Sequence, residues 1–275
     1  MVVIDGCDDH GVHRRHVTAF LELDVTEPAL LAFQVAAATR PAEERLSITC
    51  DGEAVPFREV AAPHEGRLHV IDAQVGRTVL EYSATVEGAL PAPETTELDL
   101  LAYRRPSRYC PSDRLLSIAN GEFDGIDDTG ELVSAVRDFV YGRLFYLGGS
   151  SKPTDDAIDT LLLGEGVCRD YAHLVVALLR ARDVPARLVA VYAPGLDPMD
   201  FHAVVEAWVD GSWRVVDATG LAPRPSMLRI GTGRDAADTA FLSVHHGMAE
   251  LLSVNVLAVV DELPNDDGTA VVALS

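Results

Sequence analysis

The predicted fold depends most on one stretch, Gly164-Glu-Gly-Val-Cys168-Arg-Asp-Tyr-Ala-His-Leu. After Cys168, apolar residues occupy most of the circumference of a helix, which predicts a centrally buried helix over 168–182. Cys168 opens this helix, so its sulfur is expected near unpaired backbone N–H groups and the positive end of the helix dipole. These groups can stabilise a thiolate and bind an oxyanion, which makes Cys168 a candidate nucleophile. A small packed residue is the commoner role of a cysteine beside an apolar helix.

A hairpin downstream supplies a histidine and a carboxylate. Strand-like residues flank Asp210-Gly211, and a two-residue turn there would pair positions whose numbers sum to 421. In that register His202 and Asp217 are diagonal neighbours on one face, with backbones ~7–8 Å apart. A carboxylate on an apolar strand is costly without a partner, so Asp217 is expected to hold the imidazole. Each residue alone has an ordinary structural explanation, but together with Cys168 they predict a Cys-His-Asp catalytic triad.

Several segments resemble the core of the transglutaminase-like superfamily, in its bacterial branch. They are Gly166-Val-Cys-Arg-Asp-Tyr-Ala-His-Leu, Val184-Pro-Ala-Arg-Leu-Val-Ala-Val-Tyr192, Asp200-Phe-His-Ala and Trp213-Arg-Val-Val-Asp-Ala-Thr. The resemblance extends over most of the chain and is strongest over 164–241. It implies an α+β fold with a papain-like, transglutaminase-like catalytic core, preceded by an N-terminal antiparallel β domain. It also implies that Cys168 is the nucleophile, His202 the base and Asp217 the orienting group.

The resemblance points to further residues around the triad, and two positions depart from the family pattern. Asp183 stands where the family usually has glycine at the end of the helix, and glycine adopts a left-handed backbone more easily. The tryptophan that often follows the histidine closely is displaced to Trp208, which the hairpin register places opposite Trp213. The residues expected to complete the oxyanion site or line the cleft are Tyr146, Val167, Arg169, Trp208, Arg234 and Asp235. The last two could equally form a surface ion pair.

Periodicity predicts two domains. Residues 12–87 alternate between apolar and polar, which indicates half-buried strands, and Asp51-Gly52 and Gly76-Arg77 are natural hairpin turns. A linker rich in proline and acidic residues follows, so we expect a β-sandwich-like domain over 1–97 and a catalytic domain over 98–275. In the second domain, helices are expected to precede an antiparallel sheet that ends with a strand over 251–260.

Composition narrows the possible partners. The chain has 275 residues and a net charge of −21, which disfavours nucleic acid and anionic lipid. No secretory signal or membrane-spanning run is present in the sequence, so we expect a cytoplasmic protein with reduced cysteines. Cys7, Cys50 and Cys110 are then bystanders. His245-His246 is assigned to a solvated loop, and we expect no metal site and no cofactor.

The expected chemistry is acyl transfer. A Cys168 thiolate would attack an amide, His202 would protonate the departing amine, and water or an amine would resolve the thioester. Water makes the protein a protease or deamidase, and a lysine amine makes it a transglutaminase. We favour hydrolysis of peptide or glutamine amides, with a protein or peptide as substrate. The alternative is a catalytically vestigial, transglutaminase-like scaffold that binds proteins. An acyl-CoA-dependent transferase fits less well, because its cysteine lies in an N-terminal helical bundle.

Overall fold

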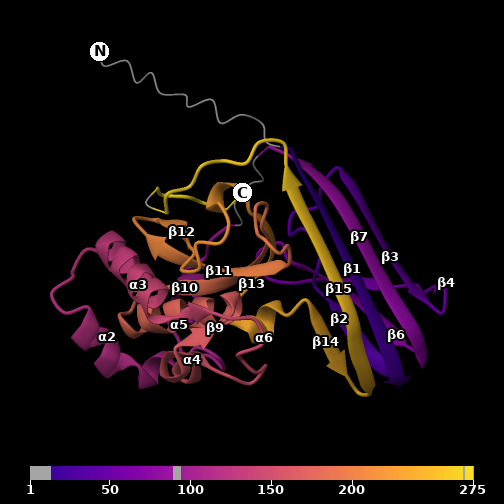
Figure 1. Ribbon diagram of the computed structural model, residues 1–275, viewed down its shortest axis with the longest axis horizontal. Helices are drawn as coiled ribbons and strands as arrows, with labels where there is room; N and C mark the ends of the chain where they lie inside the picture. Colours follow the sequence, from indigo (N-terminus) through magenta and orange to yellow (C-terminus); the bar gives the residue numbers. More distant parts are fainter. Residues whose placement is uncertain (1–13, 89–93, 269, 275) are drawn as a thin grey trace, which may run out of the picture.

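A computed structural model describes residues 14–88, 94–268 and 270–274 of the chain. Figure 1 shows two parts side by side, a set of long twisted strands and a smaller sheet surrounded by helices. The division agrees with the predicted α+β class and with an antiparallel β region before the helices. None of the helices in the described ranges is long and apolar enough to cross a membrane. Cys7 and residues 89–93 of the predicted linker lie outside the described residues.

The long strands form two antiparallel sheets. The first has the order β15-β1-β7-β3-β4 and contains β1 (Arg14–Glu27), β3 (Glu43–Cys50), β4 (Glu53–Ala54), β7 (Gly76–Glu87) and β15 (Met248–Val260). The second has the order β14-β2-β6-β5 and contains β2 (Ala29–Phe33), β5 (Arg58–Ala61), β6 (Arg67–Ala73) and β14 (Leu242–His245). Along β1 every second residue from Arg15 to Val25 is buried, so the period of two predicted from the sequence is confirmed.

The strand over 251–260 was expected in the catalytic sheet, and that expectation is wrong. Strand β15 instead runs antiparallel to β1, with Val17 opposite Ala258, while β14 pairs with β2. Both late strands thus complete the two sheets that the N-terminal strands begin (Figure 1). Their alternation identifies them as half-buried strands, but a period of two contains no information about the partner. The 97/98 boundary therefore does not separate the strands of the two parts.

The two predicted hairpin turns have different outcomes. Asp51-Gly52 joins β3 to β4 as a hairpin, as expected. Gly76 instead begins β7, and β6 and β7 belong to different sheets, so the hairpin predicted at Gly76-Arg77 is wrong. The connection between them is short in both cases. Sequence alone shows a turn here, but not whether the chain returns to the same sheet.

The helical part is built around one sheet and one buried helix. Its sheet has the order β12-β11-β10-β13 and contains β10 (Ala186–Tyr192), β11 (Phe201–Val209), β12 (Ser212–Val216) and β13 (Leu228–Gly233). Around it lie α1 (Glu97–Ala102), α2 (Leu116–Glu122), α3 (Thr129–Arg143), α4 (Ala157–Leu163), α5 (Cys168–Ala181) and α6 (Ala236–Thr239). Two short strands, β8 (Phe145–Tyr146) and β9 (Glu165–Gly166), form a separate parallel pair. Short 3-10 turns occupy Ser112–Arg114 and Arg224–Ser226.

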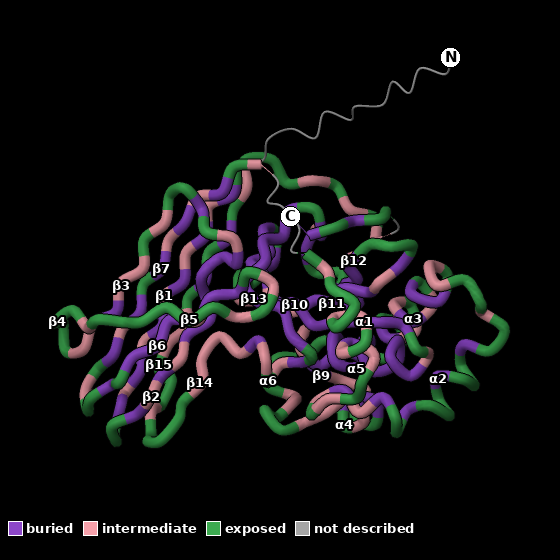
Figure 2. Tube along the Cα trace, turned by 180° about the vertical axis from the view of Figure 1, so that it is seen from behind, coloured by how far each residue is buried: buried purple, intermediate pink, exposed green. Residues whose placement is uncertain are grey.

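Helix α5 is buried along nearly its whole length (Figure 2). It packs against β10 and β11 on one side and against α2, α3 and α4 on others. The predicted helix over 168–182 is therefore confirmed, and an apolar circumference is what such a position requires. After the helix, Asp183 adopts a left-handed backbone with φ of 61°.

The two parts share a core. Tyr192, Leu228 and Ile230 from the smaller sheet pack into the cluster formed by the long strands. Helix α6 and β14 follow β13 directly and lead the chain from one part to the other (Figure 1). Side chains from the two parts can therefore contact one another where β10, β11 and β13 face the long strands.

Candidate active site

Cys168 is the first residue of α5, and only Val167 separates it from β9. The helix start is fixed by Asp170, whose fully buried carboxylate accepts the backbone N–H of Val167 at 2.9 Å through Oδ2. Gly166 allows this close approach because it has no side chain between the strand and Asp170. The thiol of Cys168 is free and half-buried. The helix therefore begins with a partly accessible sulfur beside unpaired backbone N–H groups.

The hairpin predicted around Asp210-Gly211 has the expected register. Trp208 pairs with Trp213, and Val205 pairs with Val216. His202 on β11 then lies beside Asp217, which directly follows β12, and Nε2 of the ring is 3.0 Å from Oδ2 of the carboxylate. Both side chains are buried. The predicted contact between imidazole and carboxylate is therefore present.

Thr219 fixes the other oxygen of Asp217. Its backbone N–H and its hydroxyl donate to Oδ1 at 2.8 and 2.7 Å. Burial alone would raise the pKa of Asp217, but His202 and the hydrogen bonds from Thr219 hold it below its usual value. The carboxylate is thus charged, hydrogen-bonded on both oxygens and unable to turn away from the ring.

The charge of Asp217 determines the state of His202. Burial on its own would lower the pKa of His202, but the carboxylate and the adjacent Cys168 outweigh it and raise the pKa to about 10. Nδ1 of the ring is buried and makes no conventional hydrogen bond within the described residues. With Nε2 directed at Asp217, Nδ1 is the ring nitrogen available to the thiol. The arrangement can hold an imidazolium next to a thiolate.

Tyr146 reaches the cysteine through the pairing of β8 with β9. The register places Tyr146 beside Gly166, two residues before Cys168. Its hydroxyl lies against the thiol and the backbone N–H of Cys168, and burial together with the electrostatic influence of that cysteine raises its pKa to about 12. The ring remains 45% exposed and leans on Tyr171. Tyr146 is therefore placed where a neutral hydroxyl could donate to an oxyanion.

The two neighbours of Cys168 have different outcomes: Arg169 lines the cavity, as expected, whereas the backbone N–H of Val167 is not available. The backbone N–H of Val167 is occupied by Asp170, so an oxyanion role for that group is wrong. Arg169 lines the cavity beside Cys168, but its guanidinium is bound to Asp170 and donates at 3.1 Å to Ser151 and to the backbone oxygen of Lys152. Arg169 thus anchors the loop before α4 to the start of α5.

Trp208 does not reach the site. It lies six residues after His202 on β11, about 20 Å along an extended strand. There it packs edge-on against Trp213, with 5.3 Å between ring centroids. The expected role of Trp208 in the cleft is therefore wrong. The cross-strand pair at the hairpin turn explains the position of this residue instead.

Arg234 and Asp235 separate into two different roles. Arg234 is exposed and forms an ion pair with Asp238 at 2.8 Å, not with its neighbour. Asp235 is buried, caps α6 through Ala237 and accepts the backbone N–H of Tyr109 at 2.9 Å. Neither lines the cavity at Cys168, although Ala236 and Ala237 do. Asp235 therefore supports the cavity wall from behind.

The other histidines and cysteines lie apart from this arrangement. His173 stacks on Tyr109 and accepts the backbone N–H of Ala236. His245 and His246 are exposed at the end of β14, and no group of metal-binding side chains is found within the described residues. Cys110 is buried, which raises the pKa of its thiol to about 12.

Sequence reasoning missed three residues at the site. Asp170 and Thr219 had recognisable signals, since an acidic residue at the third helical position and a threonine two residues after an aspartate commonly bond backbone groups. Gln34 had none. It follows β2 in the N-terminal part, yet it lines the cavity beside Cys168.

Comparisons with known proteins agree with this architecture. The family model of the transglutaminase-like superfamily matches residues 117–218. A crystal structure of a "Putative Cysteine Protease" from Cytophaga hutchinsonii is similar over 93% of each chain, with 30% sequence identity and a TM-score of 0.83. An uncharacterized protein of Mycobacterium leprae is 25% identical over 204 residues, which cover 69% of this chain and 71% of that protein. An uncharacterized protein of Mycobacterium tuberculosis H37Rv is 33% identical over 125 residues, covering 39% and 40% of the two chains. From the family match and the full-length structural relative, we conclude that this chain belongs to the transglutaminase-like superfamily.

Proposed function

We propose that the protein is a cysteine-dependent hydrolase of peptide or glutamine amides, with Cys168, His202 and Asp217 as its catalytic triad. The observation that carries this proposal is the buried His202–Asp217 pair at 3.0 Å, held beside the thiol that opens α5. A charged pair of this kind is costly to bury, and its position next to a partly accessible thiol suits catalysis. The similarity to a "Putative Cysteine Protease" supports hydrolysis.

The first half of the proposed reaction forms a thioester. The Cys168 thiolate attacks the carbonyl carbon, and the carbonyl oxygen becomes an oxyanion that accepts from the Cys168 N–H and the Tyr146 hydroxyl. As the C–N bond breaks, the imidazolium of His202 gives its Nδ1 proton to the departing amine or ammonia. Asp217 keeps Nε2–H directed away from the substrate throughout.

The second half releases the acyl group. A water molecule gives a proton to Nδ1 of His202 and attacks the thioester carbonyl, and collapse of the intermediate expels the Cys168 thiolate. The product is a carboxylic acid, and the imidazolium and thiolate are restored. A primary amine in place of water would give a new amide, which is transglutaminase chemistry on the same residues. A cytoplasmic location, where thiols stay reduced, suits such a nucleophile.

Mass spectrometry of a glutamine-containing peptide library tests the proposal. The protein is incubated with the library, with and without a primary amine, beside Cys168→Ala. Cleaved peptides or a one-dalton gain on glutamine, absent with the variant, are expected from hydrolysis. Amine adducts would show that the protein transfers the acyl group to an amine instead of hydrolysing the amide. If no product of any kind forms, the protein is a vestigial scaffold.

Alkylation at neutral pH gives an independent test of the thiolate. Iodoacetamide is expected to modify Cys168 faster than Cys50, which is also half-buried but lies at the end of β3 and not at the start of a helix. His202→Gln should remove most of this advantage while leaving labelling of Cys50 unchanged. Equal rates for the two cysteines in the native chain would argue against an activated nucleophile.

A further inference from the structure

A cavity of about 450 Å³ opens beside Cys168 and His202 at the seam between the two parts of the molecule. Its walls are mostly apolar and come from β10, β11, β13, α6 and the residues leading into β14. Phe201 and Phe241 stand together in this wall, with ring centroids 5.2 Å apart and planes 22° from parallel. Such a wall offers a planar apolar side chain a surface to stack on.

Gln34 brings a polar group into this apolar setting. The residue is 2% exposed and lines the cavity. Its carboxamide lies over Gly231, where an added Cβ would come within 2.4 Å of Nε2. Within the described residues, the side chain of Gln34 makes no hydrogen bond. Its backbone N–H donates to the backbone oxygen of Phe241. Neither polar atom of the amide is among the fully buried side-chain atoms that lack a partner, so both stay reachable from the cavity and an occupant can offer them a hydrogen bond.

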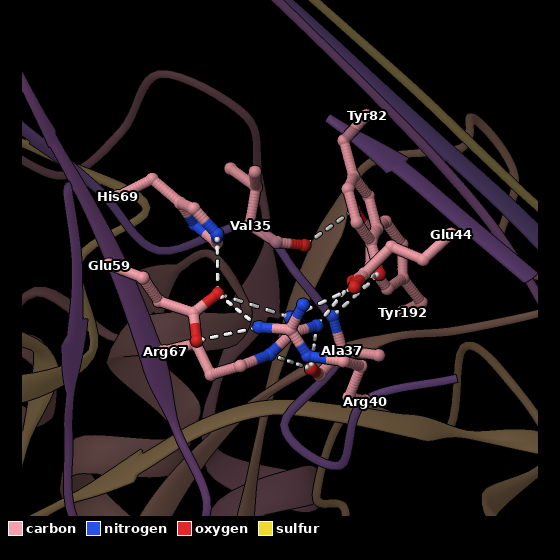
Figure 3. Close-up of polar contacts among 9 residues, drawn as sticks. All are labelled: Val35, Ala37, Arg40, Glu44, Glu59, Arg67, His69, Tyr82 and Tyr192. Atoms are coloured by element: carbon pink, nitrogen blue, oxygen red, sulfur yellow. Dashed lines mark hydrogen bonds and ion pairs between the residues drawn. The ribbon is translucent and has the colours of Figure 1, made fainter. Parts of the chain in front are cut away.

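The segment after Gln34 is held on one side by side chains of the long strands, as Figure 3 shows for Ala37. Arg67 donates to the backbone oxygen of Ala37 through Nε at 3.0 Å and Nη2 at 2.8 Å. The hydroxyl of Tyr82 accepts the N–H of Ala37 at 2.9 Å, and the guanidinium of Arg67 is itself bound by Glu44. These contacts fix the backbone three residues after Gln34.

Contacts from the smaller sheet fix the same segment from the other side. The hydroxyl of Tyr192 donates to the backbone oxygen of Val35 at 2.8 Å, as Figure 3 shows. The N–H of Ala38 donates to the backbone oxygen of Arg229 at 2.9 Å. The carboxamide is therefore carried on a preorganised support, which is the usual construction of a recognition group.

We propose that this cavity receives the side chain of the substrate residue on the acyl side of the reacting amide, and that Gln34 selects tyrosine there. The proposal rests on the proposed function, because it places the pocket relative to the acyl group bound to Cys168. The aromatic ring lies against Phe201 and Phe241, and the phenol hydroxyl is hydrogen-bonded to the Gln34 carboxamide. The β part of the molecule thus supplies a specificity residue to the site.

The charges around the cavity favour a neutral occupant. Arg169 lines the cavity, but its guanidinium is already paired with Asp170. Asp200 lines the wall next to Phe201 and disfavours a carboxylate there. A phenylalanine would fill the same space and leave the Gln34 amide without a partner. Tyrosine satisfies both the apolar walls and the amide.

Binding to Cys168→Ala tests the pocket without requiring catalysis. The probes are N-acetyl-tyrosinamide and N-acetyl-phenylalaninamide, titrated while the side-chain amide signals of glutamine are followed by NMR. The chain has only one other glutamine, Gln74, which is exposed and serves as the internal control. We expect tyrosinamide to bind at least about tenfold more tightly and to shift the Gln34 signal but not that of Gln74.

Gln34→Met keeps the length of the side chain and removes its hydrogen-bonding groups. It is expected to erase the preference for tyrosinamide, and Gln74→Met to leave it unchanged. Equal affinity of the native pocket for both probes, or no binding of either, overturns the pocket proposal whether or not Gln34→Met folds. If tyrosinamide still binds but no peptide library is hydrolysed, the result counts against the proposed function and not against the pocket.

Discussion

A Cβ atom on Gly166 would lie 2.7 Å from the Cβ atom of Asp170, closer than side-chain carbons approach in folded proteins. We therefore predict that Gly166→Ala lowers the free energy of unfolding by about 1–3 kcal/mol, because either β9 or the first turn of α5 has to move. Alkylation of Cys168 should slow in the same variant. Urea denaturation and iodoacetamide kinetics measure the two effects. The matched control is Gly142→Ala on α3, where nothing lies within 4 Å, and it should be neutral or stabilising.

Asp217→Asn tests the orienting group. The amide keeps the shape of the side chain but removes the charge that outweighs burial at His202, so the pKa of His202 should fall from its raised value. Proposed amide hydrolysis should slow on the order of 10²–10⁴-fold. NMR titration of the ring protons measures the pKa, and Thr219→Val provides a milder variant that removes one hydrogen bond to Asp217. An unchanged titration of His202 in Asp217→Asn would contradict the electrostatic account.

The raised pKa of His202 predicts how stability depends on pH. A group whose pKa is higher in the folded state contributes stability fully below its unfolded pKa, near 6.5, and loses it as pH rises toward the folded value of about 10. The difference in unfolding free energy between the native chain and His202→Gln should therefore shrink from pH 6.5 to 10. Denaturation at matched pH values measures it. A constant difference across this window would show that the imidazolium is not stabilised.

Asp183→Gly should stabilise the protein. Asp183 has φ of 61° after the last turn of α5, a conformation that glycine adopts without the cost carried by other residues. Its carboxylate is largely exposed, so loss of the ion pair with Arg104 matters little. Relief of the left-handed strain, less the chain entropy that glycine loses on folding, should raise the free energy of unfolding by about 0.5–1 kcal/mol, as measured by thermal or urea denaturation. Gly164 at the end of α4 has φ of 73°, so Gly164→Ala is the reverse change and should destabilise the protein by a similar amount.

Glu206 lies between two buried arginines on the face of the sheet away from α5. It is 2.7 Å from both Arg187 and Arg229, and all three side chains are buried. Glu206→Gln leaves two cations without their shared anion and should cost about 3–5 kcal/mol. Asp210→Asn removes an exposed ion pair with Arg214 and should cost no more than about 1 kcal/mol. Comparable losses in the two variants would show that the buried pairs contribute little.

Much of the candidate site could be predicted because its geometry is local. The start of α5 and the β11–β12 hairpin are each set by short-range rules, so the register that joins His202 to Asp217 follows from a two-residue turn. The proximity of Tyr146 was expected only from family resemblance, and the structure explains it by the β8–β9 pairing.

The remaining errors have both local and long-range causes. Val167 was expected at the oxyanion site or in the cleft, but its backbone N–H donates to the buried carboxylate of Asp170. Trp208 lies on the correct strand but too far along it. Gln34 and β15 depend on contacts between segments far apart in the chain, which alternation and turn chemistry do not specify.

The pairing of β15 with β1 has a consequence for how the molecule folds. During synthesis, the edge of β1 that later pairs with Val256 and Ala258 has no partner until the whole helical part of the chain has been made. An open edge is a template for wrong pairing, and non-local strand pairing is slow. Helix α5 and its neighbours rely on nearer contacts and can form earlier. The helical part of the chain is therefore expected to fold first, and β15 then completes the sheet that β1 and β7 begin.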